Sequence, residues 1–342
     1  MPALDLPSLD VGARVQHTLR VVERIERSTA NGEPFVILTL GNATGAIDSA
    51  PIWANFLAEG WADGAARGAA VQAIGQVALY EAKGAAKKKR QLKLTAPVRV
   101  LPREALDLAE FLPRIAEDPA RLWEKLDDLR RGISSARLKR VLALFFDDEP
   151  FRLDFERTPA SVGAHHSKVG GLLLHVWEVA YIARAMAKAM RADEDVVLAG
   201  VLLHDIGKLE AYDVAWEGFV RTAAGNLIEH VVLGAMMLDE RLARAAAGGA
   251  GAAPLCSEEQ RLELLHLILS HHGRLEHGSP VRPLTLEAEI VHRADDASAK
   301  AADVADSTAD DEAFREGEQF GERSKLWRVD RRSIWRRPHG WD

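Results

Sequence analysis

The pattern of hydrophobic and polar positions changes near Pro102. Before this point the chain holds short β-rich runs separated by glycine-centred turns: VQHTLRVVERIERS, FVILTLGN, AIDSAPIW, AVQAIGQVALYE and RQLKLTAPVRVL. The dipeptide Asn31-Gly32, between the first two runs, is typical of a hairpin turn. Five short strands within residues 14–101 predict a small barrel or sandwich and favour an OB-fold.

After Pro102, apolar residues recur at spacings of three and four, which indicates helices. This spacing is found at 101–118, 118–133 and 135–148, and further helices are expected at 170–191, 195–208, 227–247, 258–272 and 285–304. We therefore expect a multidomain α+β chain in which a small β-barrel precedes an all-α domain. The expected parts are an OB-fold nucleic-acid-binding module at 1–101, a helical connector at 102–150, an all-α domain at 151–305, and an acidic spacer with a Trp/Arg-rich tail at 306–342.

Composition agrees with an ordinary globular protein. Hydrophobic residues make up 47% and charged residues 28% of the 342 positions. No apolar run approaches the roughly 20 residues that span a bilayer, and the N-terminus lacks the basic and apolar regions of a signal peptide. The single cysteine, Cys256, excludes an internal disulfide framework and fits a reducing compartment. We expect a cytoplasmic protein with no membrane partner.

The net charge is −7, and the charged residues are distributed unevenly along the chain. Residues 83–93 are locally basic, residues 295–312 are rich in acids, and the tail from Arg323 to Arg337 combines arginines with Trp327 and Trp335. Because the overall field repels polyanions, a nucleic acid would have to bind these local basic patches.

Histidines and acids recur inside stretches that otherwise suit a protein core. They are His175, His204, Asp205, His230, His271, His272 and Asp295. Burying one imidazole or carboxylate without a partner costs a few kcal/mol, and a lone case is more often a hydrogen-bonded core group. Five separate helices that each offer such groups predict a metal site instead. Imidazole and carboxylate ligands together suit Mn, Fe, Co or Zn.

The order H…HD…H…HH…D, with HDIGK as its second element, resembles the HD superfamily of metal-dependent phosphohydrolases. The stretches HHSKVGGLLLHVWEVA, LLHDIGKLEAY, GNLIEHVVLG and LSHHGRLEHGSPVRPLTLEAEIVHRADDASA are more closely similar to the YhaM family of 3′→5′ exoribonucleases. The resemblance covers about residues 14–300, because that family also places an OB-type module before its HD domain, and it extends to LWRVDRR in the tail. It implies that residues 151–305 form the HD domain.

The resemblance also implies the ligands of two divalent ions, with Mn first and Co, Fe or Zn as alternatives. The first ion would be held by His175, His204, Asp205 and Asp295, with Asp205 bridging, and the second by His230, His271 and His272. Spacing leaves open which of His271 and His272 contacts the ion, and whether Asp295 or Asp296 is the last ligand. Glu229 stands where the family usually has a small residue.

Beside these ligands, Asp205 and Lys208 are the candidate catalytic residues. Lys208 would neutralise a phosphate oxygen, or alternatively satisfy the last carbonyls of its helix. His165, His166 and Lys168 would bind the terminal nucleotide or its phosphate, and a structural role for the histidines is equally compatible with the sequence. A metal-bound hydroxide would attack the phosphorus in line and release nucleoside 5′-monophosphates from the 3′ end of single-stranded RNA, with single-stranded DNA as a further substrate.

The β module would bind the strand. Its candidate phosphate contacts lie in the loop before the fifth strand and comprise Lys87, Lys88, Lys89 and Arg90. Phe35 and Trp53, together with Tyr80, are candidates for base stacking, which is worth about 1–3 kcal/mol per base. Their alternative role is to fill the core of a small barrel.

Two other functions compete with an exoribonuclease. An HD phosphodiesterase or nucleotidase could act on a cyclic dinucleotide or small nucleotide, but the chain reads HHGRLEHGSP where such phosphodiesterases carry a GYP element. A non-catalytic RNA-binding adaptor is the third possibility, and the intact set of ligands argues against it. A homo-oligomer is compatible with the sequence.

Overall fold

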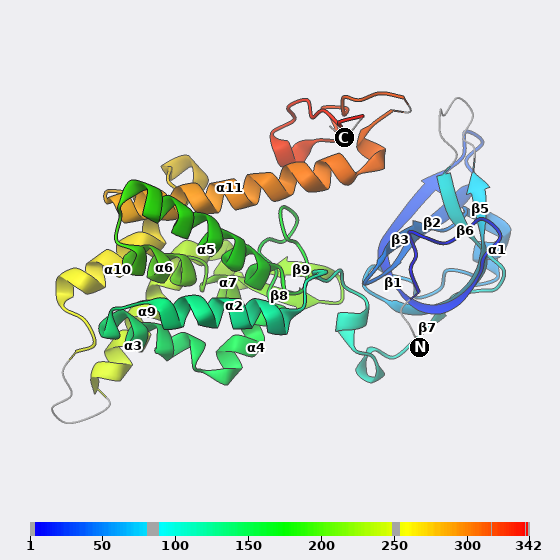
Figure 1. The fold of residues 1–342 in the computed structure, drawn as a ribbon. Helices are drawn as coiled ribbons and strands as arrows, with labels where there is room; N and C mark the ends of the chain where they lie inside the picture. The colour runs from blue at the N-terminus through cyan, green and yellow to red at the C-terminus, as the bar shows by residue number, and fades with distance from the viewer. Residues whose placement is uncertain (1–3, 81–88, 248–253, 316, 339, 341–342) are drawn as a thin grey trace. The chain divides into compact units, whose positions relative to one another are not determined.

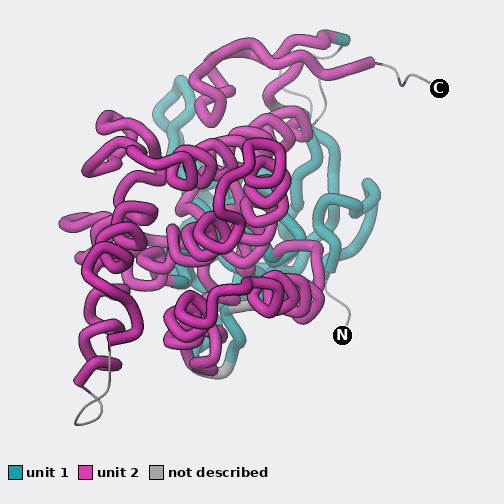
Figure 2. The backbone as a smooth tube through the Cα atoms, turned by 60° about the vertical axis from the view of Figure 1, so that its left-hand side comes forward, with its two compact units in different colours: residues 1–114, 214–218, 315–317 teal, residues 115–213, 219–314, 318–342 magenta. Residues whose placement is uncertain are grey.

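The computed structural model describes residues 4–80, 89–247, 254–315, 317–338 and 340. The chain forms two compact units (Figure 2): unit 1 holds residues 1–114, 214–218 and 315–317, and unit 2 holds 115–213, 219–314 and 318–342. Within the described ranges, no helix is both long enough and apolar enough to cross a membrane.

Unit 1 is built around an antiparallel β-barrel (Figure 1). Its strands are β1 (Arg14–Ser28), β2 (Pro34–Asn42), β3 (Gly45–Asp48), β4 (Ile52–Trp53), β5 (Ala70–Tyr80), β6 (Lys89–Leu94) and β7 (Arg99–Val100), with the short helix α1 (Ala54–Ala58) after β4. The strands follow the order β3-β2-β1-β5-β6 in the sheet. A parallel bridge between Ser49 and Leu92 brings the two ends of this sheet together, so that the barrel is nearly closed. This five-stranded, partly open barrel confirms the predicted OB-type fold.

Alternation along the strands produces the barrel interior. Leu19 and Val21 on β1, and Leu38 and Leu40 on β2, are completely or almost completely buried at every second position. Glycine is required at Gly75, where a Cβ would lie 2.6 Å from the carbonyl oxygen of Lys93. The barrel is therefore a packed core whose ligand-binding capacity must lie on its outside.

The stretch 101–118 does not form the helix that its spacing predicts. It holds two 3₁₀ turns, η1 (Arg103–Ala105) and η2 (Leu108–Glu110), and is otherwise irregular. Pro102 and Pro113 explain the difference, because proline lacks the backbone N–H that a helix interior needs.

Unit 2 is helical. Its helices are α2 (Pro119–Gly132), α3 (Ala136–Phe146), α4 (Glu149–Arg157), α5 (Gly171–Met190), α6 (Glu194–Leu203), α7 (Lys208–Ala211), α8 (Ala223–Leu227), α9 (His230–Ala247), α10 (Glu258–Ser270) and α11 (Leu286–Ala309). The strands β8 (Tyr212–Ala215) and β9 (Gly218–Arg221) form a hairpin between α7 and α8, of which residues 214–218 belong to unit 1, and η3 (Leu275–His277) follows α10.

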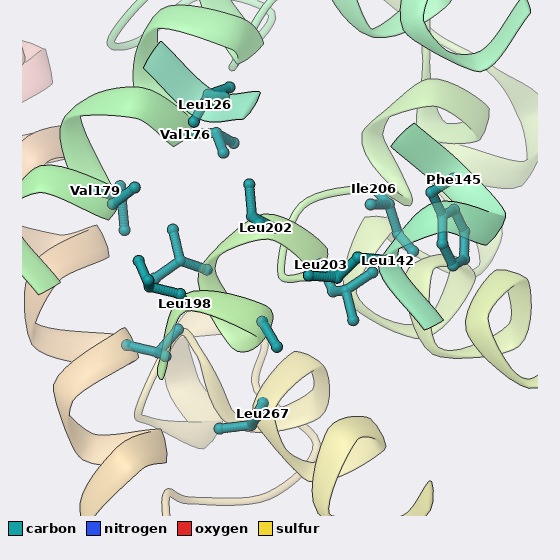
Figure 3. Packing of buried hydrophobic residues seen from close by; sticks show 14 of the residues in the cluster. Leu126, Leu142, Phe145, Val176, Val179, Leu198, Leu202, Leu203, Ile206 and Leu267 are labelled. Carbon is teal, nitrogen blue, oxygen red and sulfur yellow. The ribbon is translucent and has the colours of Figure 1, made fainter. Parts of the chain in front are cut away.

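Helix α6 lies at the centre of this unit (Figure 3). Its side chains Leu198, Leu202 and Leu203 pack among residues of the neighbouring helices, including Val176 and Leu267. A helix that is apolar all round is buried all round. The sequence His204-Asp205 at its end is therefore delivered to the middle of the domain.

The residues after α11 form a small C-terminal module, comprising 311–314 and 318–338. It includes η4 (Asp311–Ala313), η5 (Trp327–Val329) and an antiparallel bridge between Phe320 and Trp335. Its core consists of Ala313, Phe314, Leu326, Val329 and Ile334, packed against Val304 of α11. The module thus continues unit 2 at the C-terminal end of α11 (Figure 1).

Candidate metal centre

Five helices bring the predicted ligands together. His175 lies on α5, His204 and Asp205 follow α6, His230 begins α9, His271 and His272 follow α10, and Asp295 lies on α11. All of these side chains are buried except that of His272, which is half-buried. Their helices are held by the apolar core, so the polar atoms are positioned before any ion binds.

The ligand atoms form two groups. His175, His204 and Asp205 offer atoms within 4.8 Å of one another, and so do His230, His271 and His272. Asp205 faces both groups. Its Oδ2 lies 3.1 Å from Nε2 of His204, and its Oδ1 lies 3.5 Å from Nε2 of His230. One carboxylate with an oxygen toward each group has the geometry of a bridging ligand.

Six buried atoms of the site lack a hydrogen-bond partner, and five of them face the centre of the site: Nε2 of His175, His204, His230 and His271, and Oδ1 of Asp205; the sixth, Nδ1 of His230, lies on the Glu229 side of its ring. An unsatisfied buried polar atom costs about 1–3 kcal/mol, and native proteins contain few of them. The convergence of the five on one place is explained if each donates a lone pair to a cation. The residues therefore fit divalent metal ions.

Hydrogen bonds on the opposite side of the rings fix the tautomers. Nδ1 of His204 lies 2.7 Å from the carbonyl oxygen of Val201, and Nδ1 of His271 lies 2.7 Å from that of Ile268. His272 makes a similar bond of 2.8 Å to the carbonyl of His277. A carbonyl only accepts, so each Nδ1 carries the hydrogen and each Nε2 keeps its lone pair for a metal.

His175 is oriented by two side chains instead. Its Nδ1 lies 3.1 Å from Oγ of Ser298, and the same Oγ lies 2.7 Å from Oε2 of Glu178. A carboxylate only accepts, so Ser298 donates to Glu178 and accepts from His175. The sequence prediction missed both residues. Each lies three positions after a ligand, Glu178 after His175 and Ser298 after Asp295, and so shares a helix face with it.

Lys208 and Asp205 form a buried ion pair, with Nζ 2.5 Å from Oδ2. Burial would raise the pKa of Asp205, but the nearby His204 and Lys208 outweigh it and hold this pKa well below its usual value. Burial would lower the pKa of Lys208, but Asp205 raises it above the ordinary value. Both groups therefore remain charged at neutral pH.

Burial keeps two of the histidines neutral. Burial is the main cause of the low pKa of both rings. The pKa of His271 lies far below its ordinary value, and the pKa of His272 is lowered to about 4. The pKa of His204 is raised, because Asp205 outweighs the burial of the ring. Neutral imidazole is the form that binds metals, so the ring pair after α10 is ready for an ion at neutral pH.

Glu229 is part of the site. It adopts a left-handed backbone conformation with φ of 69°, and its Oε2 lies 3.5 Å from Nδ1 of His230. Arg221 donates to its other carboxylate oxygen. The nearby ring of His230, followed by the hydrogen bond from Arg221, outweighs the effect of burial and lowers the pKa of Glu229 to about 2. The residue that departs from the family pattern thus supplies a carboxylate behind a candidate ligand.

The geometry shows which of the two neighbouring aspartates, Asp295 or Asp296, lies with the candidate ligands. Oδ1 of Asp295 lies 3.0 Å from Nε2 of His175 and 3.9 Å from that of His204. Asp296 is paired with Lys300 at 2.8 Å, one turn further along α11. Asp295 is therefore the residue of this pair that lies with the ligand group, and both His271 and His272 place a nitrogen in the other group.

The predicted substrate-binding residues near the site lie on two sides of His175. His165 has its ring centroid 5.3 Å from that of His175, and burial is the main cause that lowers its pKa to about 3. His166 is turned the other way, with Nε2 3.0 Å from Oε2 of Glu178 and a left-handed φ of 48°. Together with Lys168, His166 lines a cavity of about 530 Å³ on the Glu178 side.

The barrel carries its own groove, of about 790 Å³, lined by Phe35, Trp53 and Tyr80 among others. Phe35 and Trp53 are cross-strand partners with ring centroids 5.1 Å apart. Arg90 lines the groove but donates to the carbonyls of Pro7 and Leu9, so it also fixes the N-terminal segment. Lys89 and Arg90 are the first two residues of β6 and do not lie in the predicted loop, because they pair with Tyr80 and Leu79 of β5. Lys89 lies 3.2 Å from Asp48, whereas Lys87 and Lys88 fall outside the described residues.

A helical domain with a central His-Asp pair and paired ligand groups defines an HD-domain phosphohydrolase, and the family model described as "HD domain" matches residues 172–300. Proteins named 3′-5′ exoribonuclease YhaM are similar to the chain over most of its length. The protein from Bacillus subtilis is 30% identical over 295 residues, covering 85% of this chain and 86% of the relative. That from Listeria welshimeri is 28% identical over 294 residues, covering 85% and 86%. The chain therefore belongs to the YhaM family. No solved structure matches it.

Proposed function

We propose that this protein is a metal-dependent 3′→5′ exoribonuclease that hydrolyses single-stranded RNA, and also single-stranded DNA, to nucleoside 5′-monophosphates. The observation that carries the proposal is the carboxylate of Asp205 between two groups of unpaired ligand atoms. Paired ions are suited to phosphodiester hydrolysis, and relatives spanning most of the chain are named exoribonucleases.

The ligand set suits Mn²⁺, with Co, Fe or Zn as alternatives. When bound, two such ions would activate water and stabilise the charge that develops on the phosphate oxygens. Asp205 and Asp295 supply the negative charge that attracts them. Lys208 is buried against Asp205 and stays protonated, so it would neutralise a non-bridging oxygen of the substrate. His165, which is neutral above pH 3 or so, would offer a hydrogen bond to the terminal nucleotide.

The barrel groove is our candidate for the single-strand site. Phe35, Trp53 and Tyr80 give it aromatic walls, and Trp53 and Tyr80 are exposed. Stacking on aromatic rings holds bases of any sequence, which suits an enzyme that shortens RNA without reading it. Lys87, Lys88 and Lys89 would contribute phosphate contacts.

The decisive experiment uses a 5′-labelled single-stranded RNA with Mn²⁺. We expect a ladder that shortens from the 3′ end, a reduced rate on RNA blocked by a 3′-phosphate, and no activity in Asp205→Ala. Hydrolysis of a cyclic dinucleotide but not of RNA would replace this proposal with a phosphodiesterase. Binding of RNA without turnover would replace it with an adaptor.

The basic loop is tested by changing Lys87, Lys88 and Lys89 to serine, while Arg90 is kept because it holds the N-terminal segment. We expect the salt dependence of RNA binding to fall by about 0.7 in log–log slope for each phosphate that the variant no longer neutralises. An unchanged slope would show that the loop does not bind the RNA backbone.

A further inference from the structure

The C-terminal module exposes an aromatic side chain that its own core does not use. Trp327 is 56% exposed, although Leu326 and Val329 on either side of it are buried. The guanidinium of Arg328 lies 5.4 Å from the centroid of its ring and is itself paired with Asp306. An exposed indole offers a flat apolar face together with an N–H donor, which suits contact with a partner.

The surroundings of Trp327 are basic. Four exposed arginines of the module, Arg323, Arg331, Arg332 and Arg337, have no ion pair within the part of the chain that the structure describes. Only two exposed acids of the module, Glu318 and Asp330, are unpaired within the same part. Asp330 and Arg331 both adopt left-handed backbone conformations, with φ of 55° and 53°. Strained residues of this kind tend to occur at functional sites.

Trp327 lies next to the loop that leads to the metal centre. A Cβ on Gly163 would lie 3.8 Å from Cη2 of Trp327. His165, two residues further along this loop, has its ring 5.3 Å from the ring of His175. Two residues span at most about 7 Å, so Trp327 contacts the same short loop that carries His165 to the ring of His175.

We propose that Trp327 stacks on a base of the RNA close to its 3′ end, while Arg331 and Arg332 contact the neighbouring phosphates. This inference rests on the proposed function and adds a second strand contact, separate from the groove of the barrel. An aromatic ring among free arginines has the chemistry that holds single strands without sequence preference. Its place beside the loop that carries His165 suits a contact that guides the end being shortened.

Trp335 provides a matched control. It is an exposed tryptophan of the same module, at 47%, but its indole N–H donates to Gln319 and it sits on the bridge with Phe320. We would compare Trp327→Ala, Trp327→Phe and Trp335→Ala in the full-length Mn²⁺-loaded protein. The substrates are single-stranded RNA and bis(p-nitrophenyl) phosphate, a diester too small to reach beyond the metal centre.

Trp327→Ala is expected to raise the KM for RNA about five- to tenfold relative to the KM for the small diester, at the low end of the stacking range. Trp327→Phe should recover most of the loss, and Trp335→Ala should leave this ratio unchanged. Changing Arg331 and Arg332 to glutamine should lower the salt slope of RNA binding by about 0.7 per phosphate.

An unchanged ratio in Trp327→Ala would overturn the inference. An equal rise of the KM for RNA and of the KM for the small diester would also overturn the inference, because Trp327 would then act by packing on the Gly163 loop. If the wild type does not shorten RNA, the proposed function fails. Fluorescence anisotropy of labelled RNA in EDTA then decides the inference, which is overturned if Trp327→Ala binds as the wild type does.

Discussion

At the scale of single residues, the site depends on side chains that stand behind its metal ligands. Ser298 holds His175 through Nδ1 and is itself fixed by Glu178. Ser298→Ala would leave the N–H of His175 without an acceptor and free the ring to turn. We expect the Mn²⁺ affinity to fall about 10- to 100-fold, as is usual when the group behind a metal-binding histidine is removed.

Isothermal titration calorimetry with Mn²⁺ measures this effect. Ser298→Thr keeps the hydroxyl and should bind nearly as the wild type does. Ser307→Ala removes another buried serine of α11, so it controls for a general loss of helix packing. Equal affinities of Ser298→Ala and wild type would show that Ser298 does not position His175.

Asp303 predicts a pH dependence of stability. It is 9% exposed, and its Oδ1 has no hydrogen-bond partner among the described residues. Burial, opposed by Arg328 and reinforced by Asp306, raises its pKa from 3.8 to about 6. The folded state therefore favours the protonated form. This contribution to stability is complete below about pH 4 and is lost as the pH rises through 6.

Asp303→Asn stays neutral at every pH, so it should escape this loss. We expect the melting temperature of the variant, relative to that of the wild type, to be higher at pH 7.5 than at pH 5. Thermal unfolding followed by circular dichroism at several pH values provides the measurement. A difference that does not change with pH would contradict the assignment.

At the scale of elements, the close approach of α7 to α9 sets the spacing of the two ligand groups. Gly207 lies between Asp205 and Lys208, and a Cβ there would lie 2.0 Å from the carbonyl oxygen of His230. Its φ of −67° suits any residue, so a substitution would be opposed by crowding alone. Gly207→Ala should cost at least the 1–3 kcal/mol typical of overpacking and weaken Mn²⁺ binding by displacing His230.

Gly132→Ala is the matched control, because Gly132 ends α2 and a Cβ there would meet nothing within 4 Å. It should be neutral or stabilising by up to about 1 kcal/mol. Guanidinium unfolding and Mn²⁺ titration of both variants test the pair. Similar free energies of unfolding for the two would show that the contact between α7 and α9 is not tight.

Periodicity predicted the long helices well, because a helix such as α5 or α11 is defined by its own apolar face. Periodicity predicted the structure less well where contacts with distant parts of the chain determine the backbone conformation. The helix predicted at 227–247 begins only at His230, because Glu229 adopts the left-handed conformation, and the short helix α8 before it was not predicted. The hairpin of β8 and β9 was missed, since strands of four residues are too short for a clear alternation.

The candidate metal site, like the fold, was predicted in part from the sequence. The seven candidate ligands could be proposed from the sequence because polar groups in apolar helices are unusual, but Asp296 remained an alternative to Asp295. Distinguishing the two required the structure, in which Asp295 contacts His175 and Asp296 pairs with Lys300. Glu178 and Ser298 also required it, because an ordinary glutamate or serine on a helix carries no signal of its own.

At the scale of the whole molecule, the two units cannot be obtained by cutting the chain once. The change of pattern near Pro102 indicates where the barrel strands end, but unit 1 also contains residues 214–218. There Arg20 donates to the carbonyl of Trp216, at 3.0 Å, and Phe111 lies with its ring centroid 5.5 Å from that of Trp216. A contact between positions so far apart leaves no trace in local periodicity.

Each unit has a hydrophobic core of its own, so we expect two unfolding transitions in calorimetry of the full chain. The unpaired ligand atoms belong to unit 2, which should therefore respond to metal while unit 1 does not. A metal that binds the native state but not the unfolded state stabilises the native state by about 2.7 kcal/mol when its concentration is 100 times Kd. EDTA should thus lower one melting temperature by several degrees and leave the other in place. In Asp205→Ala, where the bridging carboxylate is missing, the same transition should become insensitive to Mn²⁺. A single transition that shifts with metal would mean that the barrel and the helical domain unfold as one cooperative body.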